Sequence, residues 1–171
     1  MISLDKVNNL NKSDFVSLFG NIFEKTEWIA EKAYKNNPFS NVEEFFSIMI
    51  EIYESSNKES HQKILNAHPE LAVEKRLTED SNKEQTGANL NNCSHEEFEE
   101  FKKLNLDYKN KFGFPFIIAV KGKNKKVILN NFRQRILNDI DSEFEEAKKQ
   151  VKKIATFRLN EIINKQFFDQ K

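Results

Sequence analysis

The chain has 171 residues, which is enough for one domain with a sizeable hydrophobic core. Lysine and arginine number 27, as do aspartate and glutamate, so the net charge of zero indicates neither a nucleic-acid-binding protein nor an acidic disordered tail. The sequence has no apolar run near the roughly 20 residues of a membrane span, its first ten residues do not resemble a secretory signal, and its single cysteine is typical of a reducing compartment. We therefore expect a cytoplasmic protein that binds neither nucleic acid nor membrane.

Apolar residues recur at helical spacing in the first third of the chain. Steps of three and four predict one helix face: Phe15, Leu18, Phe19, Ile22 and Phe23. Ser13 is expected to cap that helix. Pro38 then breaks the chain, and Ser40 and Glu43 have the spacing of a capping box. A second apolar stripe predicts the helix that follows: Val42, Phe45, Phe46, Met49, Ile50 and Tyr53.

Capping-box spacing returns three times in the rest of the chain, at Ser81/Glu84, Ser94/Glu97 and Ser142/Glu145. The helix after Ser94 is expected to end at Gly113, and Asn124 precedes the next helical pattern. A final apolar stripe predicts a terminal helix of several turns: Phe144, Ala147, Val151, Ile154, Ala155, Ile162 and Ile163.

One stretch, FPFIIAV at residues 114–120, has the composition of a strand. Because it has no evident partner strand, we interpret it as an extended buried segment between helices. The lysine-rich run that follows, Lys121 to Lys126, is interpreted as a solvated turn. Only four glycines and three prolines argue against β-rich folds. The sequence predicts an all-α, bundle-like fold that occupies residues 1–171 as a single domain.

The sequence offers little for metal, phosphate or thiol chemistry. Three histidines and one cysteine are too sparse for an ordinary zinc site, so no metal is expected. Neither glycine-rich phosphate-binding pattern is present. Cys93 as a nucleophile lacks a recognisable base in the sequence, and a buried, inert thiol is the favoured interpretation.

Three other positions are candidates for acid–base or anion chemistry. His68 precedes Pro69, which biases it away from helical backbone angles and can project it into a cleft, although a half-buried histidine at a helix end is the commoner case. Glu84 can be catalytic, but the capping box suffices to explain it locally. Arg158 lies on or beside an apolar stripe and needs an anion there, either an internal carboxylate or a ligand.

Several phrases resemble the OHCU decarboxylase family, which acts on 2-oxo-4-hydroxy-4-carboxy-5-ureidoimidazoline (OHCU) in urate breakdown. They occur in one order over nearly the whole chain: LNKSDFVSLFGNIFEKTEWIAEKA, AHPELA, LTEDSNKEQ, LNLDYKNKFGFPFIIAVKG, VILNNFRQRILND and VKKIATFRL. The combination of HPELA with FGFPFIIAV is the most specific part. The resemblance implies an all-helical homodimer that converts OHCU to (S)-allantoin without metal or organic cofactor.

The resemblance also implies roles for individual residues. His68 would be the acid–base residue, assisted by Glu84, and Arg158 would bind the substrate. Other substrate-binding residues are implied by their place in the family phrases: Pro69, Ser81, Gln85, Phe116, Ile117, Ile118, Ala119 and Val120. The last five would line the ligand partly through backbone groups.

Two positions depart from the family pattern. Asn89 stands where the family usually has glycine, and asparagine tolerates left-handed backbone angles better than most residues, so the turn can survive. Cys93 stands where the family usually has a larger apolar residue. Both changes are expected to affect local packing more than catalysis.

These residue types suit a decarboxylation in which the substrate supplies its own electron acceptor, a ring C=N bond. The protein must then hold the carboxylate, stabilise negative charge and move a proton, for which histidine has a suitable pKa of about 6.5. Glu84 would orient the imidazole, while Arg158 and backbone N–H groups near residues 117–119 would hold substrate oxygens. Two alternatives remain: a non-catalytic helical interaction domain with its phenylalanine-rich face against a partner, and a related decarboxylase with altered substrate preference.

Overall fold

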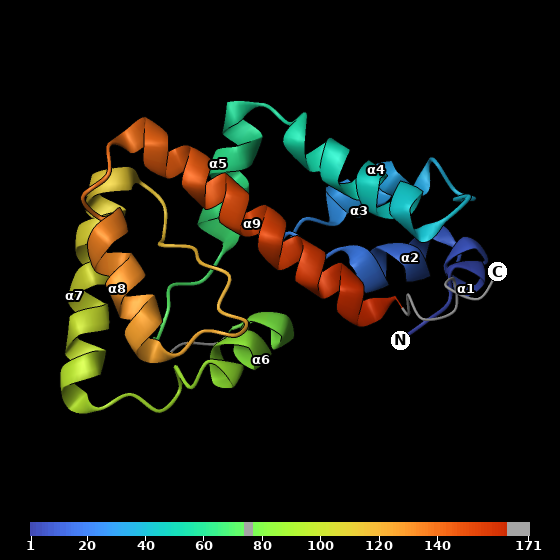
Figure 1. The fold of residues 1–171 in the computed structure, drawn as a ribbon. Coiled ribbons are helices and arrows are strands. Elements are labelled where there is room, and N and C mark those ends of the chain that lie inside the picture. Colours follow the sequence, from blue (N-terminus) through green and yellow to red (C-terminus); the bar gives the residue numbers. More distant parts are fainter. Residues whose placement is uncertain (74–76, 164–171) are drawn as a thin grey trace. The chain divides into compact units, whose positions relative to one another are not determined.

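The computed structural model describes residues 1–73 and 77–163, which form nine helices (Figure 1). They are α1 (Leu4–Asn8), α2 (Lys12–Phe19), α3 (Glu27–Tyr34), α4 (Val42–Glu54), α5 (Lys58–Ala67), α6 (Glu79–Gly87), α7 (His95–Phe112), α8 (Lys125–Arg135) and α9 (Ile140–Ile162). Within these residues there is no strand, only one parallel bridge between Ile2 and Ile163. The predicted all-α fold is confirmed.

The chain divides into two compact units. Among the described residues, the first contains residues 1–64 and 152–163, and the second contains residues 65–73 and 77–151. Thus α1 to α4 belong to the first unit and α6 to α8 to the second, while α5 and α9 contribute residues to both. The interpretation of residues 1–171 as a single domain stays a prediction.

Four of the predicted helix caps are displaced by one to three residues from those in the structure. The cap of α2 is Asn11, two residues before Ser13, and the cap of α6 is Thr78, three residues before Ser81, whereas the cap of α4 is Asn41, one residue after Ser40. At the start of α9, Asp139 Oδ1 accepts the Ser142 N–H at 2.9 Å, so Ser142 is not the cap. Only the box of Ser94 and Glu97 at α7 is confirmed. Each wrong start has two cap-forming residues close together, and their spacing alone does not decide which one is used.

Phenylalanines build much of the core of the first unit. Phe15 is fully buried, and its ring centroid lies 4.8 Å from Phe19, 5.8 Å from Phe45 and 6.1 Å from Phe39. These rings bring α2 and α4 together with the residue that follows the Pro38 break. Aromatic pairs at these separations add to the stabilisation that burial of their area gives.

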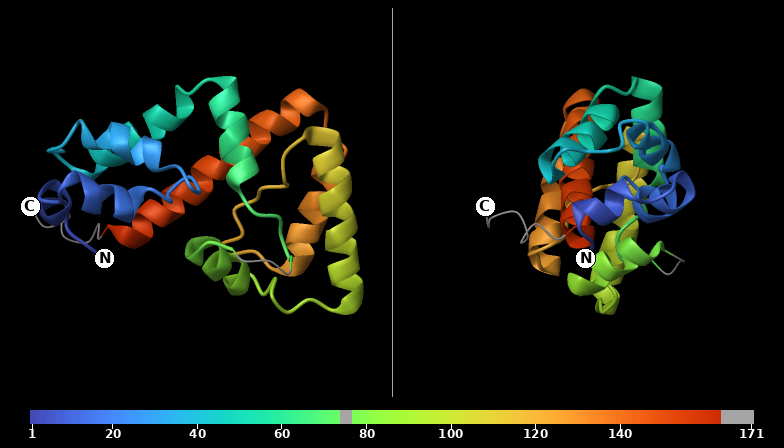
Figure 2. Two further views of the ribbon diagram at one scale, coloured as in Figure 1. Left: turned by 180° about the vertical axis from the view of Figure 1, so that it is seen from behind. Right: turned by 90° about the vertical axis from the view of Figure 1, so that its right-hand side faces the viewer.

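The second unit is built around the segment that links α7 to α8, which Figure 2 shows as a long stretch without regular structure. Gly113 ends α7 with φ 78°, as predicted for a left-handed C-cap. Residues 114–120 are all buried and pair with no strand, so the prediction of an extended buried segment is confirmed. Phe116 stacks on Phe132 of α8 at 3.9 Å between ring centroids.

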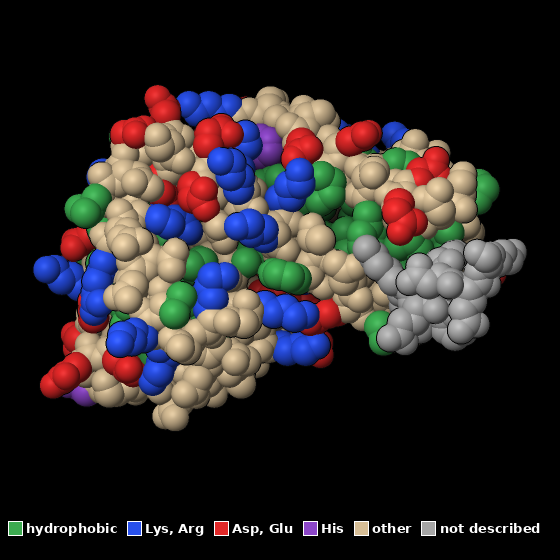
Figure 3. All heavy atoms as spheres, in the orientation of Figure 1, with side chains coloured by type: hydrophobic (Ala, Val, Ile, Leu, Met, Phe, Trp, Pro, Cys, Tyr) green, Lys and Arg blue, Asp and Glu red, His purple; other side chains and the backbone are tan. Residues whose placement is uncertain are grey.

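The lysine-rich run is solvated only in part. Lys121 and Gly122 are exposed, but Lys125 begins α8 and its Nζ lies 2.7 Å from a carboxylate oxygen of Glu97. No helix in the described part of the chain is both long and apolar enough to cross a membrane. Figure 3 shows side chains of both signs distributed over the face it displays, consistent with the balanced charge.

Candidate active site

His68 lies where α5 gives way to an irregular segment. Its backbone N–H donates to the Leu65 carbonyl at 3.2 Å, and α5 ends at Ala67. Pro69 follows, has no N–H to donate and cannot extend the helix. The side chain of His68 is only 6% exposed. The predicted break from helical structure at His68 is confirmed, and the imidazole is held in the interior.

Gln85 of α6 contacts the segment that follows His68. Its Nε2 donates to the Glu70 carbonyl at 3.1 Å, and its Oε1 accepts the Ala72 N–H at 3.1 Å. Two of the predicted phrases, HPELA and SNKEQ, are therefore joined by hydrogen bonds. The family resemblance implies that Gln85 binds substrate. In the structure its amide forms hydrogen bonds with the backbone on both sides of Leu71.

The capping-box interpretation of Ser81 and Glu84 is wrong. Thr78 is the N-cap of α6 and accepts the Ser81 N–H at 3.3 Å, so Ser81 and Glu84 lie inside the helix. Ser81 is buried, Glu84 is half-buried, and both stand within one turn of Gln85. The structural role that competed with a catalytic Glu84 is thereby removed.

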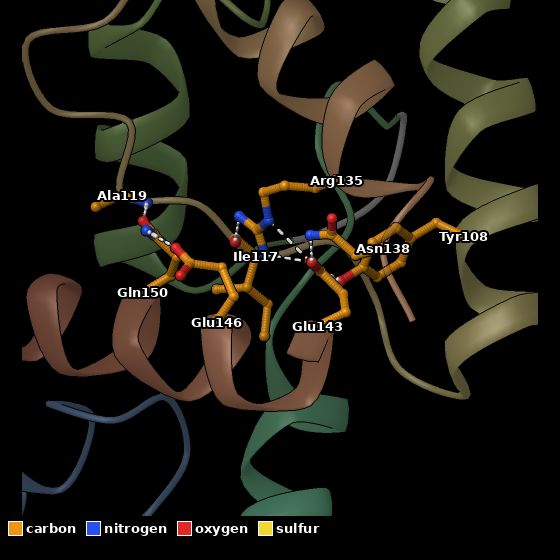
Figure 4. Close-up of polar contacts among 8 residues, drawn as sticks. All are labelled: Tyr108, Ile117, Ala119, Arg135, Asn138, Glu143, Glu146 and Gln150. Carbon is orange, nitrogen blue, oxygen red and sulfur yellow. Dashed lines mark hydrogen bonds and ion pairs between the residues drawn. The ribbon is translucent and has the colours of Figure 1, made fainter. Parts of the chain in front are cut away.

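The backbone of residues 116–120 is engaged by side chains of α8 and α9 (Figure 4). The Ala119 N–H donates to Gln150 Oε1 at 3.0 Å, and the Ile117 carbonyl accepts from Arg135 Nη1 at 2.7 Å. Sequence reasoning assigned backbone donors of this segment to the ligand. In the structure the Ala119 N–H instead donates to Gln150. Gln150 Nε2 donates in turn to Glu146 at 2.7 Å.

A buried polar network behind this segment was missed by sequence reasoning. Glu143 is fully buried, and its Oε1 accepts from Arg135 Nη2 at 2.6 Å and from the Tyr108 hydroxyl. Asn138 donates to the other carboxylate oxygen at 2.9 Å, as Figure 4 shows. Burial and the hydrogen bond to Glu143 raise the pKa of Tyr108, so it stays a neutral phenol.

The sequence contains a signal for this network. Arg135 follows Ile128 and Phe132 on the apolar face of α8, where a guanidinium requires an anion. The guanidinium carbon lies 4.4 Å from the centre of the Phe116 ring, which adds a cation–π contact. Applying to Arg135 the reasoning used for Arg158 would have predicted a buried carboxylate partner.

Arg158 lies in the first unit, on the part of α9 that follows Val151. Its Nη1 is 2.9 Å from Glu24 Oε2 and donates to the Asn21 carbonyl at 2.8 Å, with both charged side chains almost fully buried. Of the two anions proposed from sequence, the internal carboxylate is present. A substrate-binding role for Arg158 stays a prediction.

The two departures from the family pattern have simple structural outcomes. Asn89 has φ 61°, so the expected left-handed conformation is confirmed. Cys93 is half-buried beside a surface hollow of about 320 Å³ that His95 and Phe98 also line. Burial raises the pKa of the Cys93 thiol, which disfavours a thiolate nucleophile. In the part of the chain that the structure describes, no group of three His, Cys, Asp or Glu side chains is arranged to hold a metal ion.

Comparison with known proteins gives consistent matches. The family model for OHCU decarboxylase matches residues 8–160. The 2-oxo-4-hydroxy-4-carboxy-5-ureidoimidazoline decarboxylase of Haloferax volcanii is 38% identical over 160 residues, which cover 94% of this chain and 95% of the relative. The uric acid degradation bifunctional protein of Bacillus sp. strain TB-90 is 38% identical over 95% of this chain, which spans 32% of that longer protein.

Solved structures agree with these relatives. A crystal structure of (S)-allantoin synthase has a TM-score of 0.77 and 26% identity, covering 95% of this chain and 54% of that one. A crystal structure of OHCU decarboxylase in the presence of (S)-allantoin has a TM-score of 0.70 at 22% identity, covers 84% of this chain and 95% of that one, and supports the fold. Since the family model spans most of the sequence and a relative of matching length is 38% identical, the chain belongs to the OHCU decarboxylase family.

Proposed function

We propose that this protein decarboxylates OHCU to (S)-allantoin in urate catabolism, with His68 as the acid–base residue and without a cofactor. Family membership over residues 8–160 supports the reaction. The observation that carries the role of His68 is its placement: a buried imidazole at the end of α5, on a segment tied to α6 through Gln85. Glu84, one residue before Gln85 on α6, is the proposed carboxylate partner.

The chemistry needs only groups that the chain provides. As carbon dioxide leaves, the electrons of the broken C–C bond pass into the adjacent ring C=N bond, whose nitrogen takes up a proton, and a hydroxylated ene intermediate forms. A proton is then delivered to the former imine carbon, and the enol hydroxyl loses its proton as the carbonyl of allantoin forms. His68 would move the proton, and delivery from one face would give the (S) product. A positioned acid–base group contributes about 10²–10⁴-fold to such a rate.

The remaining roles concern binding and are carried over from the family resemblance. Arg158 would hold an anionic oxygen of the substrate, and Ser81 and Pro69 would contact the ligand. The side chains of Phe116, Ile117, Ile118 and Val120 are buried, as befits the wall of a site that excludes water. Gln85 has one hydrogen-bonding position left on each amide atom beyond its two backbone contacts, so it can serve both the segment and the substrate.

Freshly generated OHCU distinguishes this proposal from a non-catalytic interaction domain. Its decay should accelerate on addition of the protein, and circular dichroism should report a single enantiomer of allantoin. Spontaneous decay in buffer yields the reference rate and a racemic product. A decay curve that overlays the buffer control, with no dichroic product, contradicts the proposal and favours the interaction domain.

Glu84→Gln should slow turnover strongly and leave the melting temperature nearly unchanged, because Glu84 is not a helix cap. The matched control is Glu97→Ala at the true capping box of α7. That change should lower the melting temperature, since the Ser94 N–H loses its acceptor, without slowing turnover. Wild-type kcat in Glu84→Gln would remove Glu84 from the mechanism.

A homodimer and a cytoplasmic setting complete the proposal. The dimer is supported by the family resemblance, and the reducing compartment by the single free cysteine. Light scattering on purified protein should give twice the mass of one chain across micromolar concentrations. A mass equal to one chain throughout that range would exclude the dimer and leave the proposed reaction untouched.

A further inference from the structure

The segment after His68 has backbone groups that must find partners outside regular structure. Figure 1 shows the chain leaving α5 as an irregular stretch. Residues Glu70 to Ala72 belong to no helix, although Leu71 and Ala72 are buried. Buried backbone N–H and C=O groups are almost always hydrogen-bonded. The partners of these groups therefore determine how the residues next to His68 are held.

Two side chains from two helices supply those partners. Gln85 of α6 contacts the Glu70 carbonyl and the Ala72 N–H, both at 3.1 Å. Asn105 of α7 donates from Nδ2 to the Leu71 carbonyl at 2.9 Å, across 34 positions of sequence. Three consecutive residues are thus each fixed by a side-chain amide. We call this set, Gln85 and Asn105 with the backbone of residues 70–72, the loop clamp.

Asn105 occupies a position where packing alone would select an apolar residue. It is 3% exposed and lies on the buried face of α7 with Phe101, Tyr108 and Phe112. Its Oδ1 is buried and accepts no hydrogen bond from the residues that the structure describes. A buried amide whose oxygen has no hydrogen-bond donor is a poor choice for core stability. Its bond to Leu71 is the contact that explains it.

The backbone that the clamp holds is strained. Ala72 has φ 52°, a left-handed conformation that alanine seldom adopts. Such conformations persist only where surrounding contacts enforce them, and they gather at functional sites. The Ala72 N–H is itself one of the clamped groups. Strain and clamp therefore occur at the same residue, four positions after His68.

We infer that Asn105, together with Gln85, positions the imidazole of His68 through the loop clamp. Asn105 acts on His68 through the backbone of residues 70–72 and is a positioning residue, with no contact to the substrate required of it. The inference rests on the proposed function, because the position of His68 matters for turnover only if His68 transfers the proton. Asn105 was not among the residues that the family resemblance singled out. If the clamp loosens, the proton-transfer group is displaced while the walls of the site persist.

Asn105→Leu tests the clamp, because leucine is similar in size and lacks the donor. We expect kcat to fall between tenfold and 10²-fold with KM little changed, since misplacing a catalytic group by about 1 Å can cost 10²-fold. The pH profile of kcat should shift with the environment of His68. Asn105→Gln, which keeps an amide donor, should recover part of the loss. Asn110→Ala, on the exposed side of α7, is the matched control and should behave as wild type.

Amide hydrogen exchange measures whether the loop clamp is formed, and it needs no substrate. In the wild type, the Ala72 amide should be protected by its bond to Gln85, and Asn105→Leu should make it exchange faster and move the imidazole ¹⁵N resonances of His68. If Asn105→Leu fails to fold, the wild-type protection of Ala72 still decides: rapid exchange there overturns the clamp. A folded Asn105→Leu protein with wild-type kcat and exchange also overturns it. An inactive wild type with a protected Ala72 would refute the proposed function and leave the clamp standing.

Discussion

His68→Ala should reduce the turnover of fresh OHCU by about 10²–10⁴-fold, the contribution of a positioned acid–base group. The loss should appear in kcat, because the imidazole acts when the proton moves. His68→Gln provides a second variant that keeps bulk at a buried position. Stopped-flow dichroism would measure the rate, and far-ultraviolet dichroism would verify that each variant retains its helices.

His95→Ala is the matched control for this experiment. His95 is an exposed histidine at the first position of α7, so its removal should leave turnover unchanged. His61 is less suitable, because it is buried with its ring 4.8 Å from that of Tyr53 and its loss would disturb packing. Near-normal turnover in a folded His68→Ala protein would remove His68 from the mechanism, but it would not contradict the proposed reaction.

Helix faces were predictable from sequence, whereas helix starts were not. The apolar period places Phe15 and Phe45 on buried helix faces, as the structure confirms. It fails in part for the first stripe, because Leu18 is exposed and α2 ends at Phe19, before Ile22 and Phe23. A start depends on which of several nearby polar side chains takes the cap. Thr78 and Ser81 are both suited, and nothing local ranks them. Gly113 was predictable because only glycine takes its left-handed angle readily.

From the sequence alone, the candidate site could be predicted only as a set of short motifs in chain order. Family resemblance selected His68, Glu84 and Gln85 and implied that Glu84 assists His68, but it did not indicate which groups Gln85 contacts. The bonds from Gln85 to the His68 segment and from Asn105 to Leu71 join residues far apart in sequence, so no periodicity reports them. The carboxylate that neutralises Arg158 could not be predicted from the sequence either. Glu24 is buried and has a left-handed backbone angle, φ 65°, which no pattern in the sequence indicates.

Glu143→Gln should cost about 3–5 kcal/mol in the free energy of unfolding, because it leaves the buried Arg135 charge uncompensated. Glu143 is fully buried and accepts from Arg135, Tyr108 and Asn138. Glutamine keeps the shape and one carbonyl oxygen, which can still accept from Arg135 and Tyr108, but its NH2 group then faces the Asn138 donor. Urea unfolding followed by dichroism would measure it.

The exposed pair of Arg133 and Glu100 provides the control. It has the same charges and a similar separation of 2.6 Å, but the side chains are 50% and 35% exposed. Solvent screens such a pair, so Glu100→Gln should change the unfolding free energy by no more than about 1 kcal/mol. If the two glutamine variants lose equal free energy of unfolding, burial does not make the Glu143–Arg135 pair more important for stability than the exposed pair.

A double variant separates the charge from the packing around residues 116–120. Arg135→Met with Glu143→Leu removes both charges, and well-packed replacements of buried ion pairs are often neutral or stabilising. It also removes the donor to the Ile117 carbonyl, which Figure 4 shows as the link between the network and the segment. We therefore expect the double variant to recover most of the stability that Glu143→Gln loses, yet to raise KM, because a wall of the proposed site is no longer anchored. Recovery of stability with an unchanged KM would make the network purely structural.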